Sequence, residues 1–444
     1  MKGTGTITFE IEDLKIDKPE EPKPPAKPTP PVIVPEPVPE IPEPVIPAPI
    51  DPPVIPPQPP IVVPAPIEPP VEPAPVQPVE PAPVQNMADI ITLQYVGATR
   101  LIAGGESISD FATGTLAYNK DRNSVYMAGK APDNAIAEFA WPELTLSYDA
   151  KEIPKATVIQ SYVKMLDEYE TNKITGMLYY KDKLIVNSEI WYNASADNGY
   201  NLLVANADNL KEKVGLMKLV GGAEAAGYMG DIPLDWQERL NGTHFTGWSS
   251  VYSITSRYSQ GPSLHVFSPD EAITDRAGDF TQSTAWLNYP YDGNKVGGTQ
   301  LSHRANDTNK DVDPLWNPNA AVMYSFILDD YFICLGRNAG IRSGIGYKIT
   351  QDNGNLCHGY CPYEHDDKYP YFWIYDLNDI YSAENPHDPR PIYHGIFKIP
   401  VNGLPIGGEF IRDKNLLLIN IEGAGKTGTY DYTPLTMAFK IGLL

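Results

Sequence analysis

The sequence predicts an all-β protein in which a short N-terminal β-strand and a proline-rich arm precede one large head. Three observations carry this prediction. Residues 6–12 alternate polar and apolar side chains, the following stretch is dominated by proline, and the remainder consists of short apolar runs separated by dense turn signals. We expect a strand segment at residues 1–17, an arm at residues 18–86 and a head at residues 87–444.

The N-terminal segment has the period of two that is typical of a half-buried strand, from Thr6 to Glu12. A single strand is not stable alone in water. We therefore expect it to dock on a partner, or on a second copy of the chain, by adding a strand to an existing sheet. A disordered tail is the alternative.

The arm runs from Pro19 to Pro83 and holds 29 of the chain's 46 prolines and no glycine. Each proline fixes its own φ and disfavours helical geometry at the residue before it. The arm should therefore adopt polyproline II at about 3.1 Å per residue, or about 200 Å when fully extended. A spacer is the expected role, and a ligand for a proline-binding domain is the alternative.

Two sequence units recur in the head. The first is an apolar strand, a tight turn containing aspartate and a second apolar strand, found at Leu116–Met127, Met177–Val186, Phe326–Ile333 and Phe410–Leu418. The second is an alternating strand that ends in acidic or amide residues, found at Tyr200–Leu210, Ser263–Ala272 and Tyr371–Ile380.

The order of hairpin, third strand and outer strand is that of a β-propeller blade. Spacings of about 60 to 80 residues between units predict five or six blades. The first strand of the head, residues 90–96, is expected to pair with the last, residues 435–441, which would close the ring and remove both sheet edges. Residues 233–240 show the only clear helical periodicity.

With these repeats, the head resembles the five- and six-bladed propellers of the glycosidase, sialidase and lectin type. The plan of docking strand, arm and head resembles bacteriophage fibre and appendage proteins. Together these resemblances imply a virion appendage or decoration protein that docks on virion proteins by its N-terminus and presents the propeller to a host-surface glycan or another virion protein. The alternatives are a propeller-type glycan hydrolase and a purely structural capsid or tail protein.

The charge of the chain bears on its partners. A formal net charge of −22 would be repelled by phosphate backbones and anionic lipid, so we expect neither nucleic acid nor a membrane as a partner. The N-terminal residues lack the apolar region of a secretory signal. We therefore expect synthesis in a host cytoplasm and a location in the virion, with a cell-surface or extracellular protein that has lost its signal as the alternative.

The head is rich in aromatic residues, with all 27 tyrosines and all seven tryptophans of the chain. Amphipathic rings in loops suit sugar faces and protein interfaces, although any one ring can also serve the core. The candidate ligand-binding residues are Trp191, Tyr192, Trp248, Tyr252, Tyr258 and Trp316.

Catalysis by a propeller glycosidase needs two or three carboxylates that converge on the central funnel. Several acids lie in suitable segments, namely Asp182, Glu189, Asp270, Asp329 and Asp376. The sequence does not show convergence, so we assign no catalytic residue.

Two segments carry potential metal ligands. Oxygen ligands at alternating positions fit a loose calcium loop, formed by Asp307, Asn309, Asp311 and Asp313, with a solvated acidic turn as the alternative; calcium is the cofactor that this loop would hold. Cys357 and Cys361, with His358 and His365, leave three states open: a zinc site, a local disulfide or free thiols.

Overall fold

The computed structural model describes residues 85–87, 90–166, 171–195, 199–249, 253–293, 298–302 and 312–443. The docking segment at residues 1–17 and almost all of the arm at residues 18–86 lie outside these ranges, so both stay predictions. Within the described ranges, the helices are too short and too polar for any of them to cross a membrane.

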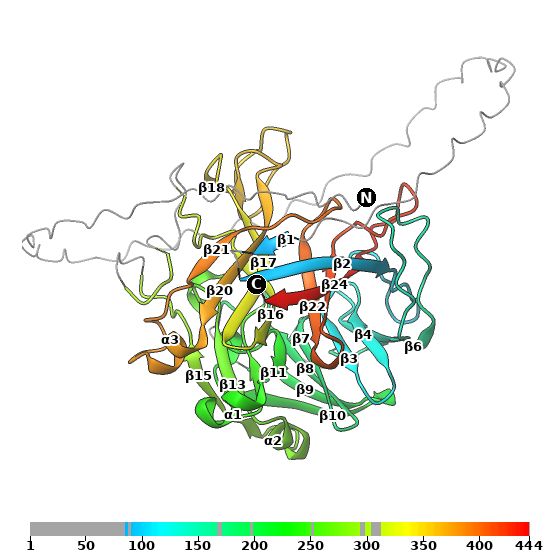
Figure 1. Cartoon of the computed structure of the whole chain (residues 1–444), viewed down its shortest axis with the longest axis horizontal. Helices are drawn as coiled ribbons and strands as arrows, with labels where there is room; N and C mark the ends of the chain where they lie inside the picture. The colour runs from blue at the N-terminus through cyan, green and yellow to red at the C-terminus, as the bar shows by residue number, and fades with distance from the viewer. Residues whose placement is uncertain are drawn as a thin grey trace, which may run out of the picture. The chain divides into compact units, whose positions relative to one another are not determined.

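The described head is a five-bladed β-propeller (Figure 1). Each blade is an antiparallel sheet whose four main strands are ordered from the inner to the outer edge. Blade 1 comprises β3 (Leu116–Asn119), β4 (Ser124–Ala128), β5 (Ala135–Ala140) and β6 (Val158–Lys164). Blade 2 comprises β7 (Lys173–Tyr180), β8 (Lys183–Glu189), β9 (Leu202–Asn206) and β10 (Asn209–Leu219), with the short β14 (Phe280–Thr281) parallel to β10.

Blade 3 comprises β11 (Met229–Asp231), β12 (His244–Thr246), β13 (Leu264–Phe267) and β15 (Ser283–Leu287). Blade 4 comprises β16 (Ala321–Leu328), β17 (Tyr331–Ala339), β20 (Lys368–Asp376) and β21 (Tyr393–Ile396).

Blade 5 is built from both ends of the head. Its first three strands are β22 (Pro405–Ile411), β23 (Leu416–Ile421) and β24 (Leu435–Leu443), and its fourth is β2 (Ile91–Thr99), with β1 (Gln85–Met87) at the edge. Antiparallel pairing runs from Ile91 opposite Leu443 to Thr99 opposite Thr436. The predicted closure is therefore confirmed, and the inner strands β3, β7, β11, β16 and β22 contact one another around the ring.

The two ends of the ring differ. All four predicted hairpins are confirmed, and each ends its inner strand in a tight turn. In blade 2, Lys181 and Asp182 adopt φ values of 44° and 62°, as a two-residue turn between twisted strands requires. We call this end the turn face. The opposite end, where the inner strands begin and the long connections between second and third strands lie, is the loop face.

Helices cluster at the turn face. The predicted helix is confirmed as α1 (Leu234–Leu240), which replaces the tight turn in blade 3. Both α2 (Pro269–Thr274) and α3 (Leu377–Ser382) follow third strands, and the 3-10 turn η3 (Arg412–Lys414) lies in the last hairpin. The loop face carries η1 (Gly222–Glu224), η2 (Thr255–Arg257) and the hairpin of β18 (Ile345–Tyr347) and β19 (Tyr360–Pro362). Figure 1 shows α1 and α2 at the end of the ring opposite β18.

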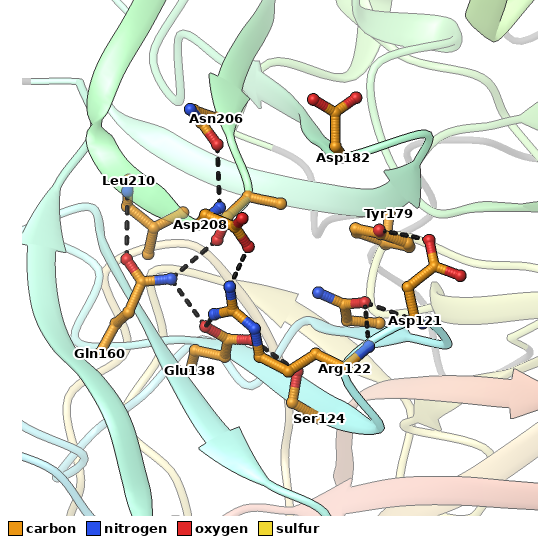
Figure 2. Close-up of polar contacts among 12 residues, drawn as sticks. Asp121, Arg122, Ser124, Glu138, Gln160, Tyr179, Asp182, Asn206, Asp208 and Leu210 are labelled. Carbon is orange, nitrogen blue, oxygen red and sulfur yellow. Dashed lines mark hydrogen bonds and ion pairs between the residues drawn. The ribbon is translucent and has the colours of Figure 1, made fainter.

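Blades 1 and 2 are joined near the turn face by a buried carboxylate (Figure 2). Glu138 is fully buried and accepts hydrogen bonds from Ser124 Oγ at 2.5 Å, Arg122 Nη1 at 2.8 Å and Gln160 Nε2 at 2.7 Å. Arg122 also pairs with Asp208 of blade 2, and Gln160 Nε2 also donates to a blade 2 carbonyl. Arg122 neutralises the buried charge and the other two donors stabilise it. Because Arg122 and Gln160 also contact blade 2, the network joins the two blades.

Replacing Glu138 with alanine should lower the free energy of unfolding by about 3 kcal/mol, because Arg122 and Gln160 lose their buried acceptor. Replacing Asp208 with asparagine is the matched control, because it removes the other ion-pair partner of Arg122. The Asp208 side chain is 69% exposed, so this change should cost less than about 1 kcal/mol. Urea unfolding of the full chain measures both values, and equal costs would contradict the account.

Burial also makes stability depend on pH through His265 on β13. The residue is 3% exposed, its Nδ1 lies 3.5 Å from Ser283 Oγ, and burial lowers its pKa to about 4. The unfolded chain binds the proton near the ordinary value of about 6.5. The contribution of the neutral His265 to stability is therefore fully present above pH 6.5 and is lost as the pH falls towards 4.

We expect this residue to contribute on the order of 3 kcal/mol to the loss of stability between pH 7 and pH 4. The His265→Leu variant should show a flatter decline in unfolding free energy over that range than the wild type. The exposed His358 offers a surface control as His358→Leu. An unchanged slope in His265→Leu would contradict the assigned role.

Candidate functional site

The candidate site lies on the loop face of blade 2, beside the mouth of the ring. Strand β7 begins at Lys173 and β8 ends at Glu189, and the two residues are direct partners in the sheet. A register shift between Ile174 and Gly176 sets this pairing. Without the irregularity, Ile174 would face Glu189, because a shift of one residue exchanges the two faces of a strand.

Lys173 and Glu189 form an ion pair with 3.3 Å between Nζ and Oε1. The glutamate side chain is 1% exposed and the lysine side chain 21%. Burial lowers the pKa of Lys173, the charge of Glu189 partly offsets that effect, and the positive charge of Arg337 on β17 lowers the pKa further. The site thus holds a partly desolvated cation and a buried carboxylate at the start of an inner strand.

A small pocket of about 20 Å³ opens beside this pair. Its lining includes several polar side chains and comprises Thr171, Ser188, Glu189, Ile190, Asn193, Gly199, Tyr200, Asn201 and Ala223. Asn201 Oδ1 accepts from the Leu219 backbone, but Asn201 Nδ2 and Thr171 Oγ1 are buried and have no hydrogen-bond partner among the described residues. Buried polar atoms of this kind call for a water or a ligand group, because leaving them unpaired is costly.

Two of the predicted aromatic residues follow Glu189 on the connection between β8 and β9. Trp191 is 36% exposed and Tyr192 is 68% exposed. The Trp191 backbone N–H donates to Asn172 Oδ1 at 2.9 Å, and Lys173 Nζ lies 4.8 Å from the centre of its indole ring. The pocket therefore shares a loop with two exposed rings, a combination suited to a ligand that is both apolar and rich in hydroxyls.

Three other predicted aromatic residues are corrected by the structure. Trp248, Tyr258 and Trp316 are between 0% and 1% exposed, so they offer no surface to a ligand. They pack in series, with Trp248 centred 5.5 Å from Tyr258 and 6.2 Å from Trp316. The Tyr258 hydroxyl lies 3.1 Å from the carbonyl oxygen of Trp191, to which it donates, so this buried row supports the loop from beneath. Tyr252 lies outside the described residues.

Among the five acids in suitable segments, Glu189 alone is on the loop face. Asp182 and Asp329 lie in tight turns, Asp270 lies in α2 and Asp376 caps α3, all at the turn face. Glu189 is also the only carboxylate among the described residues that line the pocket. The sequence did not identify Lys173, Thr171 or Asn201 as site residues. Asn201 lies inside the repeat unit Tyr200–Leu210, whereas Thr171 and Lys173 shortly precede the unit Met177–Val186.

The predicted calcium loop stays a prediction, because Asp307, Asn309 and Asp311 lie outside the described residues. Asp313 is described, and its Oδ1 accepts from the Leu315 backbone at 2.9 Å. The described ranges hold no group of three or more His, Cys, Asp or Glu side chains arranged to bind a metal. Cys357 and Cys361 form a disulfide, which answers the question that the sequence left open.

Comparisons with known proteins add little. No protein-family model and no curated protein matches the chain. Among solved structures, a candidate glycosidase from Bacteroides thetaiotaomicron is 10% identical, with 75% of this chain and 87% of that chain covered and a TM-score of 0.35. A structure from the GH130 family of mannoside phosphorylases, described as containing glycoside hydrolases, is also 10% identical, with coverages of 78% and 94% and a TM-score of 0.38. With sequence identities and TM-scores this low, the assignment of the protein as a β-propeller rests on its own five sheets and not on similarity to these structures.

Proposed function

We propose that the head is a glycan-binding propeller and that the pocket beside Glu189 receives part of the sugar. The observation that carries the proposal is the pair of unpartnered buried atoms, Thr171 Oγ1 and Asn201 Nδ2, in a pocket that also holds a carboxylate. A sugar hydroxyl both donates and accepts hydrogen bonds, so it can donate to Glu189 and accept from Asn201 at once.

The size of the pocket fits this role. A volume of about 20 Å³ has room for a hydroxyl or hydroxymethyl group and not for a whole sugar ring. The ring would therefore stay outside, where the exposed Trp191 and Tyr192 offer aromatic surface to its apolar face. Hydrolysis is the alternative, but a glycosidase needs a second carboxylate within about 5 to 9.5 Å of the first. None of the described lining residues supplies one.

The wider proposal concerns the whole chain. We propose a virion appendage in which residues 1–17 dock on virion proteins, residues 18–86 act as a spacer and the head meets host-surface glycan. The proline content of the arm supports the spacer. The disulfide between Cys357 and Cys361 supports work outside a reducing cytosol, since disulfides persist in oxidising surroundings. A structural role without a receptor predicts no glycan binding at all.

The first test is a glycan array probed with the full chain and with its Thr171→Val variant. Valine keeps the shape of the side chain and replaces the hydroxyl, which has no partner in the described fold, with a methyl group. We expect binding to host-surface glycans by the wild type, and a loss of about three- to tenfold in affinity in the variant. Thermal unfolding should be unchanged or slightly raised, because no internal hydrogen bond is lost.

Thr99→Val is the matched control. Thr99 is also buried and its hydroxyl also lacks a partner among the described residues, but it lies on β2 in blade 5. Its variant should bind glycans as the wild type does. Absence of glycan binding by the full chain, or equal binding by all three proteins, would contradict the proposed site, and release of reducing ends from a bound polysaccharide would favour the hydrolase.

A further inference from the structure

A larger cavity, of about 140 Å³, lies on the loop face where blade 5 meets the connection that leads into blade 1. It is separate from the pocket of blade 2 and shares no lining residue with it. Its walls are largely apolar and contain two aromatic rings and one carboxylate, and they comprise Phe111, Ala112, Ile406, Glu422, Gly423, Tyr432 and Pro434.

The backbone at Phe111 is strained. Its φ is 56°, in the left-handed region that bulky residues rarely adopt, although its side chain is 58% exposed. Two hydrogen bonds hold the segment: Phe111 N donates to Tyr432 O at 3.1 Å, and Tyr432 N donates to Asp110 Oδ1 at 2.9 Å. Strain of this kind persists where the surroundings enforce it and often marks a functional site.

The strained backbone keeps an aromatic surface exposed. The rings of Phe111 and Tyr432 stack with their centres 4.9 Å apart and their planes 18° from parallel. Tyr432 is itself 37% exposed. Glycine would adopt this backbone conformation without cost, so stability alone does not explain why phenylalanine stands at position 111. A flat, rigid aromatic surface, by contrast, suits the apolar face of a sugar.

The carboxylate of Glu422 supplies the polar part of the cavity. Glu422 is half-buried, and its side chain makes no hydrogen bond or ion pair with any described residue. The negative charge of Glu422 acts on two cations of blade 4. Burial lowers the pKa of Arg337 and of Lys368, and the charge of Glu422 partly offsets that effect at both residues. Glu422 is the carboxylate among the described residues that line the cavity, and its oxygens can accept hydrogen bonds from hydroxyl groups there.

We infer that this cavity is a second sugar-binding position, in which a pyranose stacks on Phe111 and Tyr432 and donates hydroxyl hydrogen bonds to Glu422. The inference rests on the proposed function for the class of ligand, and it adds that the loop face holds a glycan at two separate positions. Two such positions strengthen the attachment of a repeating or branched glycan when both are engaged together.

The test uses the full chain with fluorinated phenylalanine, observed by fluorine NMR. Comparison with Phe111→Gly identifies the Phe111 resonance among those of the chain's 12 phenylalanines. The probes are the methyl pyranosides of glucose, galactose, mannose, rhamnose and N-acetylglucosamine. We expect at least one of them to shift the Phe111 resonance in the wild type and equally in Thr171→Val. Glu422→Gln should require about tenfold more sugar for the same shift, because it loses a charged acceptor.

The same experiment separates the two sites. A shift that survives in Thr171→Val supports the second position even if the array test of the first one fails. No shift with any of the five sugars would overturn the inference.

Stability provides an independent check on Phe111. We expect Phe111→Gly to leave the unfolding midpoint unchanged or raised, because relief of the left-handed strain offsets the lost stacking. Lys348→Gly is the matched control, since the exposed Lys348 has a φ of 53° and lies far along the chain in blade 4. A clear fall in the midpoint of Phe111→Gly alone would show that the ring serves the fold and would overturn its assignment to a ligand.

Discussion

The antiparallel pairing of β2 with β24 is the interaction on which the rest of the structure depends. It joins residues separated by almost the whole length of the head, from Ile91 opposite Leu443 onwards, and supplies the outer strand of blade 5. Without it, blade 5 would lose its outer strand, and closure of the ring between blades 5 and 1 would be left to packing contacts such as those between β22 and β3. The cavity at Phe111 and Glu422 lies at this junction, so closure also forms a candidate binding position.

The closed ring gives the molecule two chemically different ends. At the turn face, polar groups such as Glu138 are buried with a full set of partners, and the network joins neighbouring blades. At the loop face, Thr171 Oγ1 and Asn201 Nδ2 are buried without partners in the described structure, and Phe111 is strained yet exposed. Unpaired buried polar atoms and strained backbone occur in proteins mainly at functional sites. This contrast is why we place glycan binding at the loop face.

Much of the fold could be predicted from the sequence because each blade repeats a local pattern. The tight turns at Lys181 and Asp329 marked hairpins, and the pattern after Ser263 marked a third strand. Blade 3 left no hairpin signal, because α1 occupies the place of its turn. The site was harder to predict: the irregularity at Gly176 selects Lys173 as the partner of Glu189, and exposure separates Trp191 from the buried Trp248. Neither register shifts nor burial can be read from residue type alone.

The central claim is that glycan binds the loop face of a closed propeller. Hydrogen exchange of the full chain, with and without polysaccharide from the host surface, tests it most directly. The account predicts slowed exchange in the connections at residues 190–195 and 423–434, with no change in the turns at residues 181–182 and 329–330. Protection confined to the turn face, or no protection anywhere in the head, would contradict it.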